Sequence, residues 1–205
     1  MSQTWEERVY YRGVDIRTKV LTPIARLLAK LGVTPDMVTY SGVVLMLIFV
    51  AVAPTHPIAG FWLIVGTVFL DILDGSLARI AKVGSDRGKF TDTLADNLNS
   101  TLFIFGCLRA GLVSGLPAAM YVYFMLLTKV LMIVNKNLNK KSDWLIRPFV
   151  GAFPNTLVFG LYILFGWHAF AHHNYLNEAV ALSAALLAAK AFIDFFVIRY
   201  RHFSN

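Results

Sequence analysis

The chain has 205 residues, of which 57% are hydrophobic and 15% are charged, and its net charge is +7. Soluble domains average about 45–50% apolar and about 25% charged residues, so this composition excludes an ordinary soluble domain and predicts an integral membrane protein. The single cysteine, Cys107, excludes an internal disulfide bond. Its place in an apolar run is typical of a small core residue.

Residues 1–36 are expected to form a cytoplasmic N-terminal segment, and residues 37–205 a transmembrane domain. No secretory signal is evident, because the first long apolar run begins near Val38 and an acidic residue, Glu6, precedes it. Residues 15–31 place apolar side chains at helical spacing, with cations around them. This pattern predicts an amphipathic helix that lies in the membrane interface. An ordinary packed, solvent-exposed helix is the alternative.

Six apolar segments follow, each close to the roughly 20 residues that a membrane-spanning helix needs. They comprise residues 37–53, 58–80, 90–112, 117–134, 149–170 and 179–198. Proline, glycine or polar residues separate each segment from the next, and Asp36 is expected to cap the first. The chain is therefore predicted to be all-α, with six transmembrane helices and the N-terminal interfacial helix.

The basic residues are distributed unevenly along this arrangement. All but three of the 19 Lys and Arg residues lie in the N-terminal segment, the second and fourth connections and the tail. The exceptions are Arg109, in an opposite connection, and Lys129 and Lys190, inside spans. The positive-inside rule then predicts that both termini are cytoplasmic, in a prokaryotic inner or plasma membrane. Anionic headgroups explain these cations, so no nucleic-acid partner is expected.

Four aspartates lie at the cytoplasmic ends of the second and third spans. Asp71 and Asp74 are three residues apart and Asp92 and Asp96 are four apart, so each pair shares a helix face. A charge at the centre of a membrane helix costs roughly 2.5–3.5 kcal/mol, so these carboxylates require compensation. Hard cations such as Mg²⁺ or Mn²⁺ prefer oxygen ligands. The spacing predicts a site for two such ions, which suits phosphoryl transfer. Aspartates that only cap a helix are the alternative.

The residues around these aspartates extend the pattern. Gly75 and Gly88 permit close approach of a backbone or a ligand, and Arg79 is suited to clamp a diphosphate. The full pattern is Asp-x2-Asp-Gly-x2-Ala-Arg-x8-Gly-x3-Asp-x3-Asp, over residues 71–96. At every defined position, including Ala78, it resembles the signature of the CDP-alcohol phosphotransferases, also called CDP-alcohol phosphatidyltransferases.

This resemblance implies an enzyme that transfers a phosphatidyl group from a CDP-linked lipid, of the CDP-diacylglycerol type, to a small alcohol. CMP is released, and the protein is expected to be a homodimer. In the family the four aspartates hold the metal ions, and the one that matches Asp96 is the proposed general base. The donor-binding residues that the resemblance implies are Asp74, Gly75, Ala78, Arg79 and Gly88.

Three cations near the cytoplasmic ends of the last three spans are candidates for binding the acceptor. They are Lys136, Arg147 and Arg199. Together they resemble the acceptor pocket of the phosphatidylinositol-phosphate synthase branch, which implies a polyol phosphate such as inositol phosphate or glycerol 3-phosphate. Topology alone also explains each of them as a positive-inside residue. Asn97 stands where that branch often carries Arg and phosphatidylglycerophosphate synthases often carry Lys, so it favours neither subgroup and leaves the transferase class unchanged. Serine or an amino alcohol is the alternative acceptor.

Other polar residues lie within or beside the spans. Lys190 and Asp194 are four residues apart and predict an ion pair, whereas Lys129 has no obvious partner. A histidine cluster beginning at His168 is more typical of a solvated loop than of a metal site. An intramembrane divalent-cation carrier is the rival functional class. It would explain the aspartates but not Arg79 or the glycines at their spacings.

Overall fold

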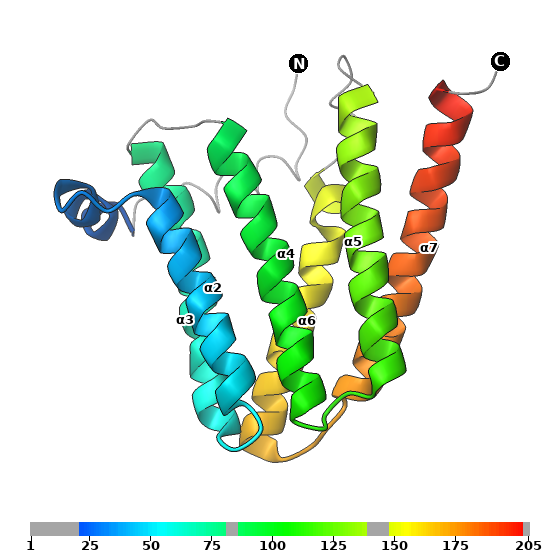
Figure 1. Ribbon diagram of the computed structural model, residues 1–205, viewed down its shortest axis with the longest axis horizontal. Coiled ribbons are helices and arrows are strands. Elements are labelled where there is room, and N and C mark those ends of the chain that lie inside the picture. The colour runs from blue at the N-terminus through cyan, green and yellow to red at the C-terminus, as the bar shows by residue number, and fades with distance from the viewer. Residues whose placement is uncertain (1–20, 81–85, 139–147, 203–205) are drawn as a thin grey trace. The chain divides into compact units, whose positions relative to one another are not determined.

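The computed structural model describes residues 21–80, 86–138 and 148–202 (Figure 1). Every regular element in these ranges is a helix, which confirms the all-α prediction. Residues 21–30 form a first helix, and longer helices follow it. These are α2 (Pro35–Val52), α3 (Pro57–Ile80), α4 (Asp86–Arg109), α5 (Gly115–Leu138), α6 (Pro148–Ala171) and α7 (Leu176–His202).

Four of these helices, α2, α3, α5 and α7, are long and apolar enough to cross a membrane, judged over the described residues. This is the length and composition of an integral membrane protein. Of the other two, α4 is the more polar, whereas α6 contains no Asp, Glu, Lys or Arg. α4 contains Asp92 and Asp96, and α6 contains Pro154 and Asn155. The count of six spans stays a prediction.

Local sequence explains where α2 and α3 begin. Each has proline as its first residue, a position where the missing N–H would have had no partner within the helix. The Thr34 hydroxyl accepts a hydrogen bond from the Met37 N–H at 3.3 Å, so the N-cap of α2 is Thr34 and not Asp36, as the sequence had suggested. Asp36 lies in the first turn, where its negative charge interacts favourably with the helix dipole.

Two glycines end helices in the left-handed backbone region. Gly32, with φ +77°, follows helix 21–30; its N–H donates to the Ala29 carbonyl, and the Val33 N–H donates to the Leu28 carbonyl. Gly111, with φ +70°, ends α4 with the same pattern. Other residues are strained at these angles, so glycine fixes the direction in which the chain leaves each helix.

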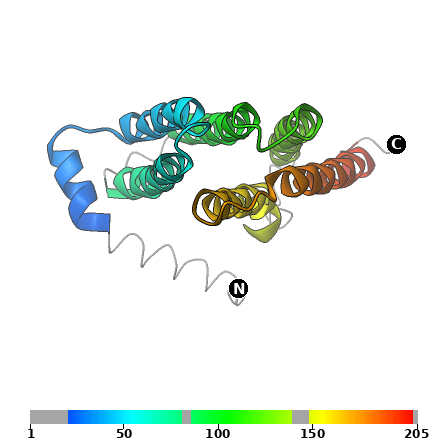
Figure 2. The same cartoon turned by 90° about the horizontal axis from the view of Figure 1, so that it is seen from below.

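The described residues belong to two compact units. Unit 1 comprises residues 21–51 with Trp62–Leu102, and unit 2 comprises Val52–Phe61 with the described residues from Phe103 onward. A buried apolar cluster in unit 1 joins helix 21–30 to α2 and α3. Its members are Leu21, Ala25, Val38, Leu73 and Leu77. Figures 1 and 2 show that helix 21–30 runs across the direction of α2 and α3.

Unit 2 contains α5 packed against α7, together with two polar contacts that involve lysine. Lys190 Nζ lies 2.6 Å from Asp194 Oδ2, which confirms the predicted ion pair. The buried Lys129 donates to Asn155 Oδ1 at 2.9 Å, a partner that the sequence did not reveal. This second contact joins α5 to α6 beside Pro154.

Gly166 in α6 is a position where the backbone of unit 2 is tightly covered. A Cβ there would lie 2.6 Å from Cε2 of Phe61, whose ring packs edge-on against Phe170 with centroids 5.3 Å apart. We expect Gly166→Ala to reduce the free energy of unfolding by about 1–3 kcal/mol, because the ring must move. Thermal unfolding of the detergent-solubilised protein measures this effect.

Gly160→Ala is the matched control on the same helix. Nothing lies within 4 Å of a Cβ at Gly160, so alanine should keep or raise the unfolding temperature through its helix propensity. Equal stability of the two variants would contradict the proposed constraint at Gly166.

Candidate metal centre

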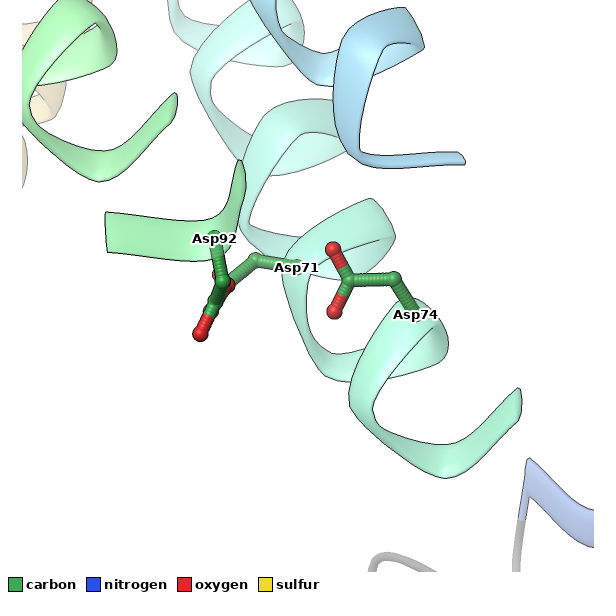
Figure 3. A group of neighbouring side chains, drawn as sticks. All are labelled: Asp71, Asp74 and Asp92. Atoms are coloured by element: carbon green, nitrogen blue, oxygen red, sulfur yellow. The ribbon is translucent and has the colours of Figure 1, made fainter. Parts of the chain in front are cut away.

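Three carboxylates of unit 1 converge. Asp71 and Asp74 from α3 and Asp92 from α4 each offer an oxygen within 4.8 Å of the others. Figure 3 shows the three side chains pointing toward one another. Among the described residues this is the one such group of three or more acidic, histidine or cysteine side chains, and no histidine around His168 belongs to it.

The geometry follows from helix periodicity. Asp71 and Asp74 share a face of α3 because they are three residues apart, and α4 presents Asp92 to that face. Asp74 is buried, whereas Asp71 and Asp92 are exposed. Three carboxylate oxygens at this separation are a ligand set for a hard divalent cation, which takes oxygen donors. The residues therefore fit the Mg²⁺ or Mn²⁺ that the sequence predicts.

Thr39 contributes to this centre in a way that the sequence did not reveal. Its hydroxyl donates to Asp74 Oδ2 at 2.6 Å, across from α2 to α3. A buried carboxylate is costly without hydrogen bonds, so Thr39 both stabilises and orients Asp74. The two residues are 35 positions apart, and no local pattern links them. Only the packed helices bring them together.

Asp96 does not belong to the converging group. It is half-buried on α4, one turn beyond Asp92, and the separation of four residues displaces it by about 6 Å along the helix axis. Its assigned roles as metal ligand and general base stay predictions. Asn97, the next residue, donates from Nδ2 to the Thr93 carbonyl at 2.8 Å.

The predicted donor-binding residues lie beside the carboxylates along α3 and α4. Arg79 is exposed, and its guanidinium lies over Gly75, where an added Cβ would be 3.7 Å from Arg79 Nη2. Ala78 is half-buried one turn beyond Asp74, and Gly88 is half-buried near the start of α4. A Cβ at position 75 would thus be in ordinary van der Waals contact with the guanidinium.

The predicted acceptor residues belong to unit 2 or lie outside the description. Arg199 is exposed on α7. Lys136 lies in α5, but its side chain is not among those described. Arg147 lies outside the described residues. The acceptor pocket stays a prediction.

Comparison with known proteins identifies the family. The family model for CDP-alcohol phosphatidyltransferases matches residues 32–193, which is most of the chain. The chain belongs to this family. The three converging aspartates lie within the matched region, at motif positions where the sequence predicts metal binding.

Two curated relatives match at significant similarity. The chain is 39% identical over 103 residues to an archaetidylinositol phosphate synthase of Pyrococcus horikoshii, covering 48% of this chain and 54% of that protein. It is 32% identical over 90 residues to a phosphatidylinositol phosphate synthase of Cutibacterium acnes, covering 43% of this chain and 44% of that protein. The matches thus span about half the length of these curated relatives.

Solved structures share the fold. Phosphatidylinositol phosphate synthase of Mycobacterium tuberculosis, in complex with manganese and citrate, superposes with a TM-score of 0.59 at 23% identity, covering 86% of each chain. The same enzyme with CDP-DAG bound gives a TM-score of 0.58 at 22% identity, covering 87% of this chain and 91% of that one.

The hydrogen bond from Thr39 yields a test of the metal centre. Thr39→Val keeps the shape of the side chain and removes the donor to Asp74. We expect the affinity for Mn²⁺ to fall by about 10–100-fold, the usual effect of losing a partner of a ligating carboxylate. Titration of the purified protein with Mn²⁺, followed by EPR spectroscopy, measures this affinity.

Thr55→Val is the control for this substitution. The Thr55 hydroxyl donates to the Val52 carbonyl in an exposed turn, so its loss should leave Mn²⁺ binding unchanged. Unchanged Mn²⁺ affinity in Thr39→Val would show that the contact with Asp74 does not support a metal site.

Proposed function

We propose that this protein transfers a phosphatidyl-type group from a CDP-linked lipid to an alcohol and releases CMP, as a step of phospholipid biosynthesis. The convergence of Asp71, Asp74 and Asp92 within 4.8 Å is the observation that carries this proposal. These residues occupy the motif of a family whose description names the reaction class. The names of both curated relatives add support.

The aspartates and Arg79 would have separate roles in this reaction. A pair of Mg²⁺ or Mn²⁺ ions held by the aspartates would neutralise the diphosphate of the donor. Asp96 takes the proton of the acceptor hydroxyl, whose oxygen bonds to the phosphorus of the lipid. The bond from that phosphorus to the bridging oxygen breaks, and CMP leaves with its charge paired to Arg79.

We propose a polyol phosphate as the acceptor, with inositol phosphate first and glycerol 3-phosphate second. Lys136, Arg147 and Arg199 would bind its phosphate by charge-assisted hydrogen bonds. The relatives from Pyrococcus horikoshii and Cutibacterium acnes are both named for inositol phosphate products, which favours this class over serine or an amino alcohol. Their names differ in the lipid, so either an archaeal ether lipid or CDP-diacylglycerol fits as donor.

The proposed setting is a prokaryotic inner or plasma membrane, crossed six times by a homodimeric protein. α4 and α6 have 24 residues each, and a helix of that length measures about 36 Å, enough to span a bilayer. Both termini and the aspartates would face the cytoplasm, where the basic residues concentrate. Residues 15–31 would lie in the interface, with residues 15–20 outside the described part.

A divalent-cation carrier is the weaker candidate. The guanidinium of Arg79 lies over Gly75, directly beside Asp74 in the sequence. A fixed positive charge there would hinder the passage of a cation, whereas it suits the binding of a diphosphate. Cation flux through proteoliposomes without release of CMP would favour the carrier.

Release of CMP tests the proposed reaction. Purified protein is incubated with CDP-diacylglycerol, Mg²⁺ or Mn²⁺, and inositol phosphate, glycerol 3-phosphate or serine in separate reactions. We expect release of CMP with a polyol phosphate and none in excess EDTA. Ala at Asp71, Asp74 or Asp92 should reduce the rate at least about 100-fold, because charge stabilisation at the transition state is lost.

Glu178→Ala is the matched control for these variants. Glu178 is an exposed acid in the first turn of α7, so its removal should leave the rate unchanged. Full turnover in EDTA, or an aspartate variant as active as Glu178→Ala, would contradict a metal-dependent reaction at this centre.

The acceptor pocket gives a separate prediction. Arg199→Ala should raise the KM for the phosphorylated acceptor by about 10–100-fold, because a hydrogen bond to a charged group is worth about 1.5–3 kcal/mol. The KM for the donor should stay nearly unchanged, while Arg79→Ala should raise the donor KM instead. Arg109→Ala, at an exposed arginine in the last turn of α4, is the control. A normal acceptor KM in Arg199→Ala would show that Arg199 serves topology alone.

A further inference from the structure

Helix 21–30 presents two different faces. One face is buried: Leu21 and Ala25 are 8% and 0% exposed, and they join the cluster formed by Val38 of α2 with Leu73 and Leu77 of α3. This face fixes the helix to the two helices that carry Thr39 and Asp74. The contact lies entirely within unit 1.

The buried cluster is formed by the sequence neighbours of metal-centre residues. Val38 directly precedes Thr39, and Leu73 directly precedes Asp74. Successive side chains of a helix point about 100° apart, so the apolar member of each pair enters the cluster while the polar member faces the metal centre. The Thr39–Asp74 hydrogen bond of 2.6 Å therefore connects two backbone segments that helix 21–30 supports from a neighbouring face.

A neighbouring face of this helix is apolar and exposed. Ile24, Leu27 and Leu31 are 42%, 58% and 70% exposed, at spacings of three and four residues. The Leu31 N–H bonds to the Leu27 carbonyl, so Leu31 closes the last turn of the helix. Arg26 and Lys30 are exposed as well, and no acidic residue occurs between positions 21 and 31. An apolar stripe with only cations beside it complements an anionic lipid surface.

We propose that helix 21–30 binds the anionic surface of the membrane and thereby stabilises the metal centre through the Leu21–Ala25 face. This inference rests on the proposed function in one respect, which is that α2 and α3 cross the membrane. Figures 1 and 2 show that the helix runs across these two, so it would then lie along the membrane plane. The chain leaves it through Gly32 at φ +77° and the partly buried Val33, a short link to α2.

Thermodynamic linkage makes this coupling measurable. A lipid surface that binds the docked helix favours the arrangement in which Leu73 and Val38 are held in the cluster. Divalent cations bind the same arrangement, because it places Asp74 against Thr39. Each ligand must then raise the affinity for the other by the same factor.

The test uses the full chain reconstituted in two kinds of vesicle. One is phosphatidylcholine alone, and the other is an equimolar mixture of phosphatidylcholine and phosphatidylglycerol. The affinity for Mn²⁺ is measured by EPR spectroscopy at low salt and corrected for Mn²⁺ bound by protein-free vesicles. We expect the Kd for Mn²⁺ to be about fivefold lower in the anionic vesicles, the lower end of the usual range for coupled sites. High salt should remove this difference, because it screens surface charge.

Variants of the exposed face separate this effect from general charge attraction. Leu27→Ser with Leu31→Ser, and separately Arg26→Gln with Lys30→Gln, should abolish the difference between vesicles. All four side chains are exposed, so the fold should persist. Leu116→Ser on α5, where Leu116 is 73% exposed, is the control and should retain it. Retention of the full difference in both helix variants would overturn the proposal.

A second measurement locates the helix without reference to metal binding. A nitroxide is attached at Leu31→Cys, and the native Cys107 is buried and should stay unlabelled. We expect oxygen to quench this label more strongly than a water-soluble nickel complex does, as for a group below the headgroups. Stronger quenching by the nickel complex would overturn the proposal.

The two hypotheses fail in different ways. Release of CMP together with equal Mn²⁺ affinity in both vesicles would remove the coupling and leave the proposed function in place. Lipid-dependent Mn²⁺ affinity without release of CMP from any acceptor would do the reverse.

Discussion

Repulsion among three carboxylates is the constraint on which unit 1 is organised. Two unit charges 4.8 Å apart repel by about 3–4 kcal/mol at an effective dielectric constant of about 20, and solvent lowers this at the exposed Asp71 and Asp92. Asp74 is only 6% exposed, so it keeps most of the cost. The hydrogen bond from Thr39 offsets about 1.5–3 kcal/mol. A divalent cation is the natural source of the remainder.

The apolar part of unit 1 can be understood from the same constraint. A carboxylate that is repelled by its neighbours will move away unless its backbone is held. Leu73 and Leu77 flank Asp74 on α3 and are 4% and 0% exposed, and both pack in the cluster that includes helix 21–30. Because lipid tails are as apolar as leucine, this support comes from close packing of the two side chains and not from their removal from water. Hydrophobic contacts on a neighbouring face of α3 thus hold the backbone that carries the like charges.

The sequence predicted the features that depend on local spacing. The helix expected over residues 58–80 is α3 (Pro57–Ile80), and the Lys190–Asp194 pair follows from a separation of four residues. The shared face of Asp71 and Asp74 also follows from their spacing, whereas the approach of Asp92 depends on how α4 packs against α3. The Thr39–Asp74 bond was not predictable, since it joins residues 35 positions apart and depends on how α2 packs against α3. Asp96 lies one turn further along α4, and its role as a metal ligand stays a prediction.

α4 is the helix with the weakest membrane character among those described, and it carries polar side chains of the metal centre. α4 contains Asp92 of the metal centre, and α6 contains Asn155, which accepts from the buried Lys129. The mean hydropathy of a helix counts such side chains as if they faced lipid. Pairing inside the protein removes most of the free-energy cost of placing them in the membrane. Polar residues that form a site therefore lower the mean hydropathy of their helix, so that it is not recognised as a membrane span. Breaks between segments, such as Gly111 with φ +70° and the prolines that begin α2, α3 and α6, locate helix ends without that error.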